Sequence, residues 1–61
     1  MKDMTAPELT SIREQLTQEQ NLVIKYRHCA SEVTDEALKT KFDDMAERHQ
    51  KHYDKLYGLL G

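Results

Sequence analysis

Three side chains that could do chemistry stand where a helical pattern asks for apolar residues: Glu19, His49 and His52. His49 and His52 are three residues apart, so on a helix both rings point the same way from successive turns. A carboxylate and two imidazoles are a suitable set of ligands for a divalent metal. Imidazole-rich sites suit zinc, iron, copper or nickel better than magnesium or calcium. The sequence does not identify a cofactor; a divalent metal, iron or zinc, is the candidate that we consider for this site.

The same three residues also make a polar layer that needs no metal. A hydrogen bond between Glu19 and either histidine pairs both groups. A polar residue in an apolar seam can also fix the register and the partner of a coiled coil. The metal centre and the metal-free polar layer are therefore two open interpretations of the same candidate site.

Other residues with reactive side chains give weaker signals. We expect His28 to lie on the surface. Cys29 is expected to be a small core residue on the flank of its helix. Tyr26 is expected to lie on the seam and to pack against Phe42. The sequence contains no Ser/His/Asp set, no Gly-rich phosphate loop and no cysteine cluster. Nucleophilic catalysis has no support, and an enzyme is not the favoured interpretation.

Two helices must position these side chains, and the first is predicted over residues 6–33. Thr5 and Glu8 have the spacing of a capping box, and Pro7 lies in the first turn, where its missing N–H does no harm. The seam positions of this helix alternate in steps of three and four, which is typical of a heptad. They are Leu9, Ile12, Leu16, Glu19, Val23, Tyr26, Ala30 and Val33.

A turn at residues 34–35 is predicted to lead into a second helix over residues 36–60. Thr34 and Asp35 are both good N-cap residues, and the helix dipole favours an acidic residue in the first turn. The seam positions of the second helix are Leu38, Phe42, Met45, His49, His52, Leu56 and Leu59. Because a short turn makes the two helices antiparallel, residues equally far from the turn lie at equal heights. The predicted fold is an all-α, antiparallel two-helix hairpin in which Glu19 faces the two histidines.

The apolar stripe of each helix is wider than one seam, which implies more than one neighbouring helix. The additional residues are Leu22 and Cys29 on the first helix and Ala46, Tyr53 and Leu60 on the second. Two hairpins are therefore expected to pair as a homodimer into a four-helix bundle. The size of the chain agrees, because 61 residues form a single domain, over residues 1–61, that is marginal alone and has no disulfide to support it.

Composition limits the partners and the location. Nine basic residues are interspersed with eleven acidic ones, so no basic stripe supports nucleic-acid binding. No apolar run approaches the roughly 20 residues that span a bilayer, and the stretch MKDMTAPELT lacks the apolar core of a signal peptide. We expect a cytoplasmic protein with no nucleic-acid partner and no membrane span, and the single cysteine fits a reducing compartment.

From about Leu16 to Leu60 the chain resembles the ferritin-like superfamily. The resemblance lies in EQNLVIKYRHCA on the first helix and LKTKFDDMAERHQKH on the second. It is closest to the rubrerythrin-type helix pair and to the small bacterial spore coat proteins of the coat F type. In ferritin-like di-iron proteins one helix supplies a Glu and the next an E-x-x-H motif. Glu19 matches the first Glu and His52 matches the His, whereas His49 stands in place of the Glu of that motif.

The resemblance implies a small, non-enzymatic structural protein that assembles on the spore coat. Because His49 removes half of the carboxylates of a di-iron site, iron oxidation and storage are not expected. Two alternatives stay open: a metal-binding ferritin-like protein with iron or zinc at the bundle centre, and a helical module that supplies its helices to a protein partner.

Overall fold

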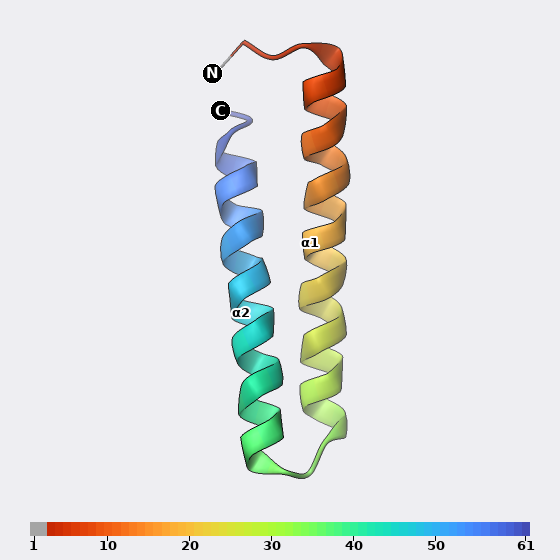
Figure 1. The fold of residues 1–61 in the computed structure, drawn as a ribbon, viewed down its shortest axis with the longest axis vertical. Coiled ribbons are helices and arrows are strands. Elements are labelled where there is room, and N and C mark those ends of the chain that lie inside the picture. Colours follow the sequence, from red (N-terminus) through yellow and green to blue (C-terminus); the bar gives the residue numbers. More distant parts are fainter. Residues whose placement is uncertain (1–2) are drawn as a thin grey trace.

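Two long helices lie side by side and antiparallel in the computed structural model, which describes residues 3–61 (Figure 1). Helix α1 spans Ala6–Glu32 and α2 spans Glu36–Gly58, and no strand is present among the described residues. The hairpin measures 46 × 14 × 10 Å, with the turn at one end and the start of α1 and the end of α2 at the other. The predicted all-α hairpin is confirmed.

A capping box begins α1, as the spacing of Thr5 and Glu8 predicts. The hydroxyl of Thr5 accepts a hydrogen bond from the backbone N–H of Glu8 at 3.2 Å, and the Glu8 carboxylate accepts one from the backbone N–H of Thr5 at 2.8 Å. The backbone and side-chain hydrogen bonds of Thr5 lower the pKa of Glu8, because both favour its charged form. The first turn is thus fixed by two residues that are only three positions apart in sequence.

The turn and the helix ends differ by one or two residues from the expected bounds. Helix α1 ends at Glu32 rather than 33 because Val33 adopts an extended backbone, and Asp35 does so too as the N-cap of α2. The Asp35 carboxylate accepts a hydrogen bond from the N–H of Leu38 at 2.8 Å, so Asp35 rather than Thr34 caps this helix. At its far end α2 stops at Gly58 rather than 60, since the N–H of Leu59 bonds the carbonyls of the last turn instead of continuing the helix.

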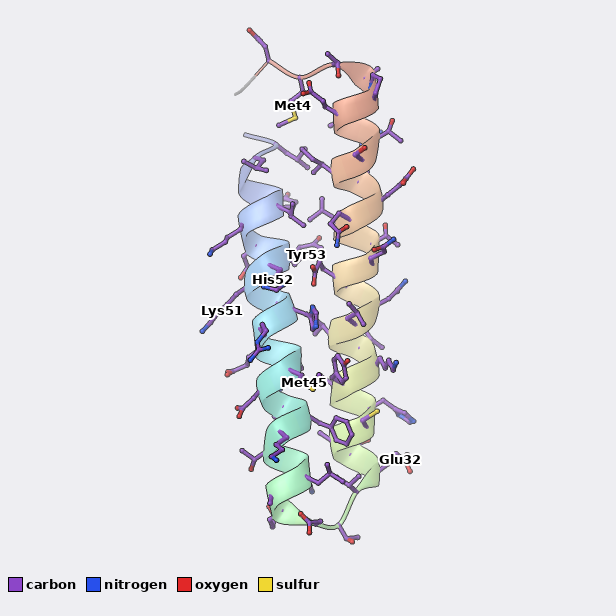
Figure 2. The ribbon with its side chains drawn as sticks, viewed as in Figure 1. Met4, Glu32, Met45, Lys51, His52 and Tyr53 are labelled. Carbon is purple, nitrogen blue, oxygen red and sulfur yellow. The ribbon has the colours of Figure 1, made fainter. Side chains whose placement is uncertain are left out.

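The core between the helices is narrow. Side chains from both helices meet along the seam (Figure 2), but among residues 3–61 the buried apolar residues are only Leu16, Ala30 and Ala46. Across the seam the rings of Tyr26 and Phe42 stack with their centroids 6.2 Å apart, as the level of the two residues predicts. Ile24 and Tyr57 are each 60% exposed. Most of the apolar residues along the seam are therefore only partly buried.

Within residues 3–61, neither helix combines the length and the apolar character that a bilayer span requires.

The Asp35 cap should make a measurable contribution to stability, because it satisfies a backbone donor that the helix itself leaves without a partner. We expect Asp35→Ala to lower the free energy of unfolding by about 1 kcal/mol in urea titrations followed by circular dichroism. Asp35→Asn is the matched control, because asparagine also caps helices, and it should retain most of the stability. Equal stability of the alanine and asparagine variants would show that the cap contributes nothing.

Candidate functional site

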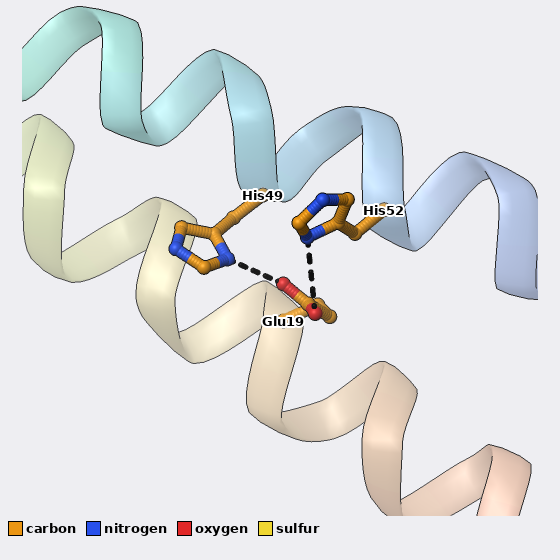
Figure 3. A group of neighbouring side chains, drawn as sticks. All are labelled: Glu19, His49 and His52. Carbon is orange, nitrogen blue, oxygen red and sulfur yellow. Dashed lines mark hydrogen bonds and ion pairs between the residues drawn. The ribbon is translucent and has the colours of Figure 1, made fainter.

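The three candidate residues converge at the middle of the hairpin. Glu19 extends from α1 towards α2, and the rings of His49 and His52 lie over its carboxylate (Figure 3). The Nδ1 atom of His49 is 2.6 Å from Oε1 of Glu19, and the Nδ1 atom of His52 is 3.5 Å from Oε2. The two rings stand edge to face, with centroids 5.5 Å apart. One carboxylate is therefore shared by two imidazoles that come from successive turns of the opposite helix.

Glu19 is buried, and both of its carboxylate oxygens have partners. Its side chain is 9% exposed, whereas those of His49 and His52 are 20% and 48% exposed. The amide of Gln15, one turn earlier on α1, donates a further hydrogen bond to Oε2 at 3.3 Å. Within residues 3–61 no buried side-chain nitrogen or oxygen lacks a hydrogen-bond partner. The layer is thus complete as a hydrogen-bonded group.

The surroundings of Glu19 keep it ionised. Burial of the carboxyl raises its pKa, but the hydrogen bonds from His49 and Gln15 and the electrostatic attraction of both histidines outweigh burial, so the pKa of Glu19 is lowered. An ionised carboxylate can only accept hydrogen bonds. In the 2.6 Å contact, Nδ1 of His49 therefore carries a hydrogen and donates a hydrogen bond to Oε1 of Glu19.

Tyr26 holds the ring of His49 from one side. The two rings stack with centroids 5.7 Å apart and an interplanar angle of 13°, and Tyr26 also stacks on Phe42, one heptad before His49. Tyr26 thus lies between two rings of α2 as a knob in a hole. This packing restricts the rotation of the His49 ring, so that Nδ1 stays directed at the carboxylate.

Sequence reasoning did not find the roles of Gln15 and Tyr26 at this layer. Gln15 lies four residues before Glu19, a spacing at which helical side chains meet, so its hydrogen bond had a local signal. For Tyr26 the sequence signal was only indirect, because a position on the seam does not determine which neighbouring side chain the ring contacts.

His28 and Cys29 lie apart from this layer. His28 is exposed, as expected, and its Nε2 atom is 3.7 Å from Glu32, four residues on along α1, with both side chains largely in solvent. Cys29 is a partly exposed free cysteine.

The side chains of the three residues are of the kinds that bind divalent metals, and the distances between their ligand atoms are close to those in a metal site. One ligand atom from each lies within 4.8 Å of the others, and within residues 3–61 they form a group that could hold an ion. Zinc binds nitrogen and oxygen at about 2.0–2.2 Å, which separates neighbouring ligands by about 3.3 Å. The contact of His52 with Glu19 at 3.5 Å matches that separation, whereas the 2.6 Å contact of His49 would have to lengthen. Three protein ligands would leave one tetrahedral position open.

Comparison of the chain with protein-family models, curated proteins and solved structures found no match. The functional argument therefore starts from the structure of this chain: its small core, and the geometry of Glu19, His49 and His52.

The lowered pKa of Glu19 predicts how stability depends on pH. Because the folded pKa lies below the ordinary value of 4.5, the contribution of Glu19 is complete above that pH and is lost as the pH falls through the folded pKa. We expect the difference in unfolding free energy between the wild type and Glu19→Gln, measured in chelator, to shrink steadily on acidification below pH 4.5.

Glu8→Gln is the control for this measurement, because Glu8 also has a lowered pKa but lies at the helix N-terminus, away from the histidines. In Glu8→Gln, the free energy of unfolding should lose the pH dependence that comes from Glu8. It should keep the pH dependence that comes from Glu19. A difference between wild type and Glu19→Gln that does not change with pH would contradict the hydrogen-bonded, ionised state of Glu19.

Proposed function

We propose that the protein is a small, non-enzymatic structural protein in which two hairpins pair into a ferritin-like four-helix bundle. The observation that carries the proposal is the size of the core. Within residues 3–61 only Leu16, Ala30 and Ala46 are buried apolar residues. Two of these three are alanines, and each buries little apolar area.

The energetics of so small a chain favour a partner. Domains of this size bury a low fraction of their surface, and those that lack disulfides or metals commonly gain stability from association. The only cysteine of this chain is Cys29, so no disulfide forms within it. A second hairpin would cover apolar side chains that are partly or largely exposed in one hairpin alone.

In this proposal the layer of Glu19, His49 and His52 determines how the two helices align along each other. A buried carboxylate has a high cost of desolvation unless it is paired, so only the alignment that brings Glu19 to the histidines is favourable. Other alignments of the two helices would leave the charge without partners. The layer thereby selects one register, as polar residues do in coiled-coil seams.

The cellular role is inferred from the resemblance to coat F-type proteins alone. On that basis we propose assembly onto the spore coat by a protein made in the cytoplasm. The contribution of this chain would be packing of helical bundles rather than a reaction.

Binding of iron or zinc at the bundle centre is the second candidate function. It is favoured by one specific observation, the convergence of a carboxylate and two imidazoles within 4.8 Å. A bound ion would draw the three side chains together as ligands and would add to the stability of the folded state.

Sedimentation equilibrium tests the dimer. The expected mass is twice that of the 7.2 kDa chain, with a dissociation that depends on protein concentration. A helical, well-folded species of single-chain mass would contradict the proposal. A poorly helical monomer would instead favour the third interpretation, a module that folds on a larger protein partner.

Titration with zinc or ferrous iron tests the second candidate. If the layer binds metal, thermal unfolding of untagged protein should shift to higher temperature with added ion, and His52→Ala should remove most of that shift. His28→Ala is the matched control, because His28 is exposed and lies away from the layer. An equal shift in the wild type and in His52→Ala would exclude this site.

A further inference from the structure

We infer that copies of this chain pack on both flanks of the hairpin, so that the paired hairpins proposed above associate further into larger stacks. The inference rests on the proposed dimer and deepens it, because it names the two surfaces through which copies pack. The flanks are the two opposite faces of the hairpin, one on each side of the seam.

The histidine flank is the face that carries His52. Gln15 and His52 both approach Oε2 of Glu19, at 3.3 and 3.5 Å, which puts these positions of α1 and α2 on one side of the seam. Other residues of this face follow on each helix at intervals of seven, which is close to two full turns. Its apolar members are Leu22 and Cys29 on α1 and Leu38, Met45 and Leu59 on α2.

The tyrosine flank is the opposite face and contains a shallow groove of about 250 Å³. The groove is lined by Gln20, Val23, Ile24, Gln50 and Tyr53. The ring of Tyr57 stacks on that of Tyr53, with centroids 6.1 Å apart, and extends the apolar surface along α2. The apolar members of this flank are therefore Val23 and Ile24 on α1 and Tyr53 and Tyr57 on α2.

The helical repeat places the two groups on opposite sides of the hairpin. Leu22 and Ile24 are two residues apart on α1, and Gln50 and His52 are two residues apart on α2. Two residues turn an α-helix by about 200°, so each helix directs one group away from the other. A copy packed on one flank therefore leaves the other flank uncovered.

Both flanks expose large apolar side chains. Within residues 3–61 the exposed large hydrophobic residues are Ile24 and Tyr57, each 60% exposed, on the tyrosine flank and Leu38, 42% exposed, on the histidine flank. The other apolar members of both flanks are partly exposed. Because burial of apolar surface favours association, a dimer that covers one flank still has an apolar surface to cover on the other.

Each flank is large enough for a stable contact. Figure 1 looks along the shortest dimension of the hairpin, onto a face of 46 × 14 Å that both helices share, and this face has an area of about 640 Å². A copy packed over one whole flank would bury roughly 1,300 Å² on the two chains together, which is within the range of specific protein interfaces.

The charges beside the flanks favour a copy over a partner of one charge sign. On α1, Arg13 and Arg27 border the tyrosine flank, and Glu8, Lys25 and Glu32 border the histidine flank. On α2, the tyrosine flank is bordered by Glu36, Lys39, Asp43, Glu47 and Asp54, and the histidine flank by Lys41, Asp44, Arg48, Lys51 and Lys55. Each flank thus carries both signs, and a copy supplies both signs in return. The net charge of the chain is only −2, so repulsion between copies is weak.

The two contacts should differ in affinity. On the tyrosine flank, an ion pair between Arg27 and Asp43 at 3.1 Å crosses the seam, and two amides line the groove, so covering this flank has a desolvation cost. The same flank carries two of the three exposed large hydrophobic residues, which favours covering it. Because the balance of these contributions differs between the flanks, we expect dimers at low protein concentration and larger assemblies at higher concentration.

Sedimentation equilibrium of the full chain over a series of concentrations tests the inference. The mass should be twice that of the 7.2 kDa chain at low concentration and should exceed this value as the concentration rises. A mass that stays at twice that of the chain at every concentration would overturn the inference and leave the dimer standing. A single-chain mass at every concentration would refute both the dimer and the inference.

One substitution on each flank tests whether both are contacts. Ile24→Glu on the tyrosine flank and Leu38→Glu on the histidine flank each put a charge where a copy would pack, so each should abolish species larger than the dimer. Both residues are exposed in the single hairpin, so the helicity measured by circular dichroism should be retained. The double variant should sediment as a single chain. Growth beyond the dimer in either single variant would show that the altered flank is no contact, and would overturn the inference.

Asn21→Glu is the matched control. Asn21 is exposed and lies two residues after Glu19, so its side chain points away from the seam and from both flanks. The variant adds the same charge to α1 as Ile24→Glu and should form the same large species as the wild type. Loss of those species in the control as well would attribute the effect to net charge and overturn the assignment of the contacts to the flanks.

Discussion

One buried carboxylate, shared by two imidazoles from the opposite helix, is the interaction on which the structure of this hairpin depends. Glu19 lies in the middle of the apolar seam, where an ionised group is unfavourable unless it is paired. His49 and His52 meet this requirement from successive turns, and Gln15 adds a hydrogen bond from its own helix. Displacement of either helix along the other would separate the charge from its partners.

The remaining packing reinforces the same alignment. Tyr26 lies between Phe42 and His49, so a stack of three rings crosses the seam next to the carboxylate. The turn adds a second restraint, because Asp35 begins α2 only three residues after α1 ends. With so few apolar residues buried, alignment depends on these specific contacts more than on the volume of the core.

The polar layer also connects the fold to the proposed assembly. Its two imidazoles differ in exposure, 20% for His49 and 48% for His52, so His52 is the more solvent-exposed histidine of the layer. In the proposed dimer, a second hairpin would cover part of the surface that this hairpin leaves exposed. One carboxylate for two imidazoles is a poor match to a di-iron centre, which needs bridging carboxylates, and a better match to a single ion or to a metal-free layer.

The level at which Glu19, His49 and His52 meet was predictable from the sequence because it follows from short-range rules. The capping signal at Thr5, the cap near residue 35 and the three-and-four spacing of the seam determine two helices and a short turn, and equal distances from that turn determine equal heights. The opposition of Tyr26 and Phe42 followed in the same way.

Only the tertiary structure decided how the side chains at that level are arranged. The stacking of Tyr26 on His49, the direction of each Nδ1 atom and the difference in exposure between the two histidines depend on rotamers chosen by neighbours on both helices. The helix ends likewise depend on local backbone geometry: α1 ends where Val33 becomes extended, and α2 ends where the N–H of Leu59 bonds the carbonyls of the last turn. Periodicity assigns a residue to a face of its helix, whereas the contacts of its side chain are set by the packing of the two helices against each other.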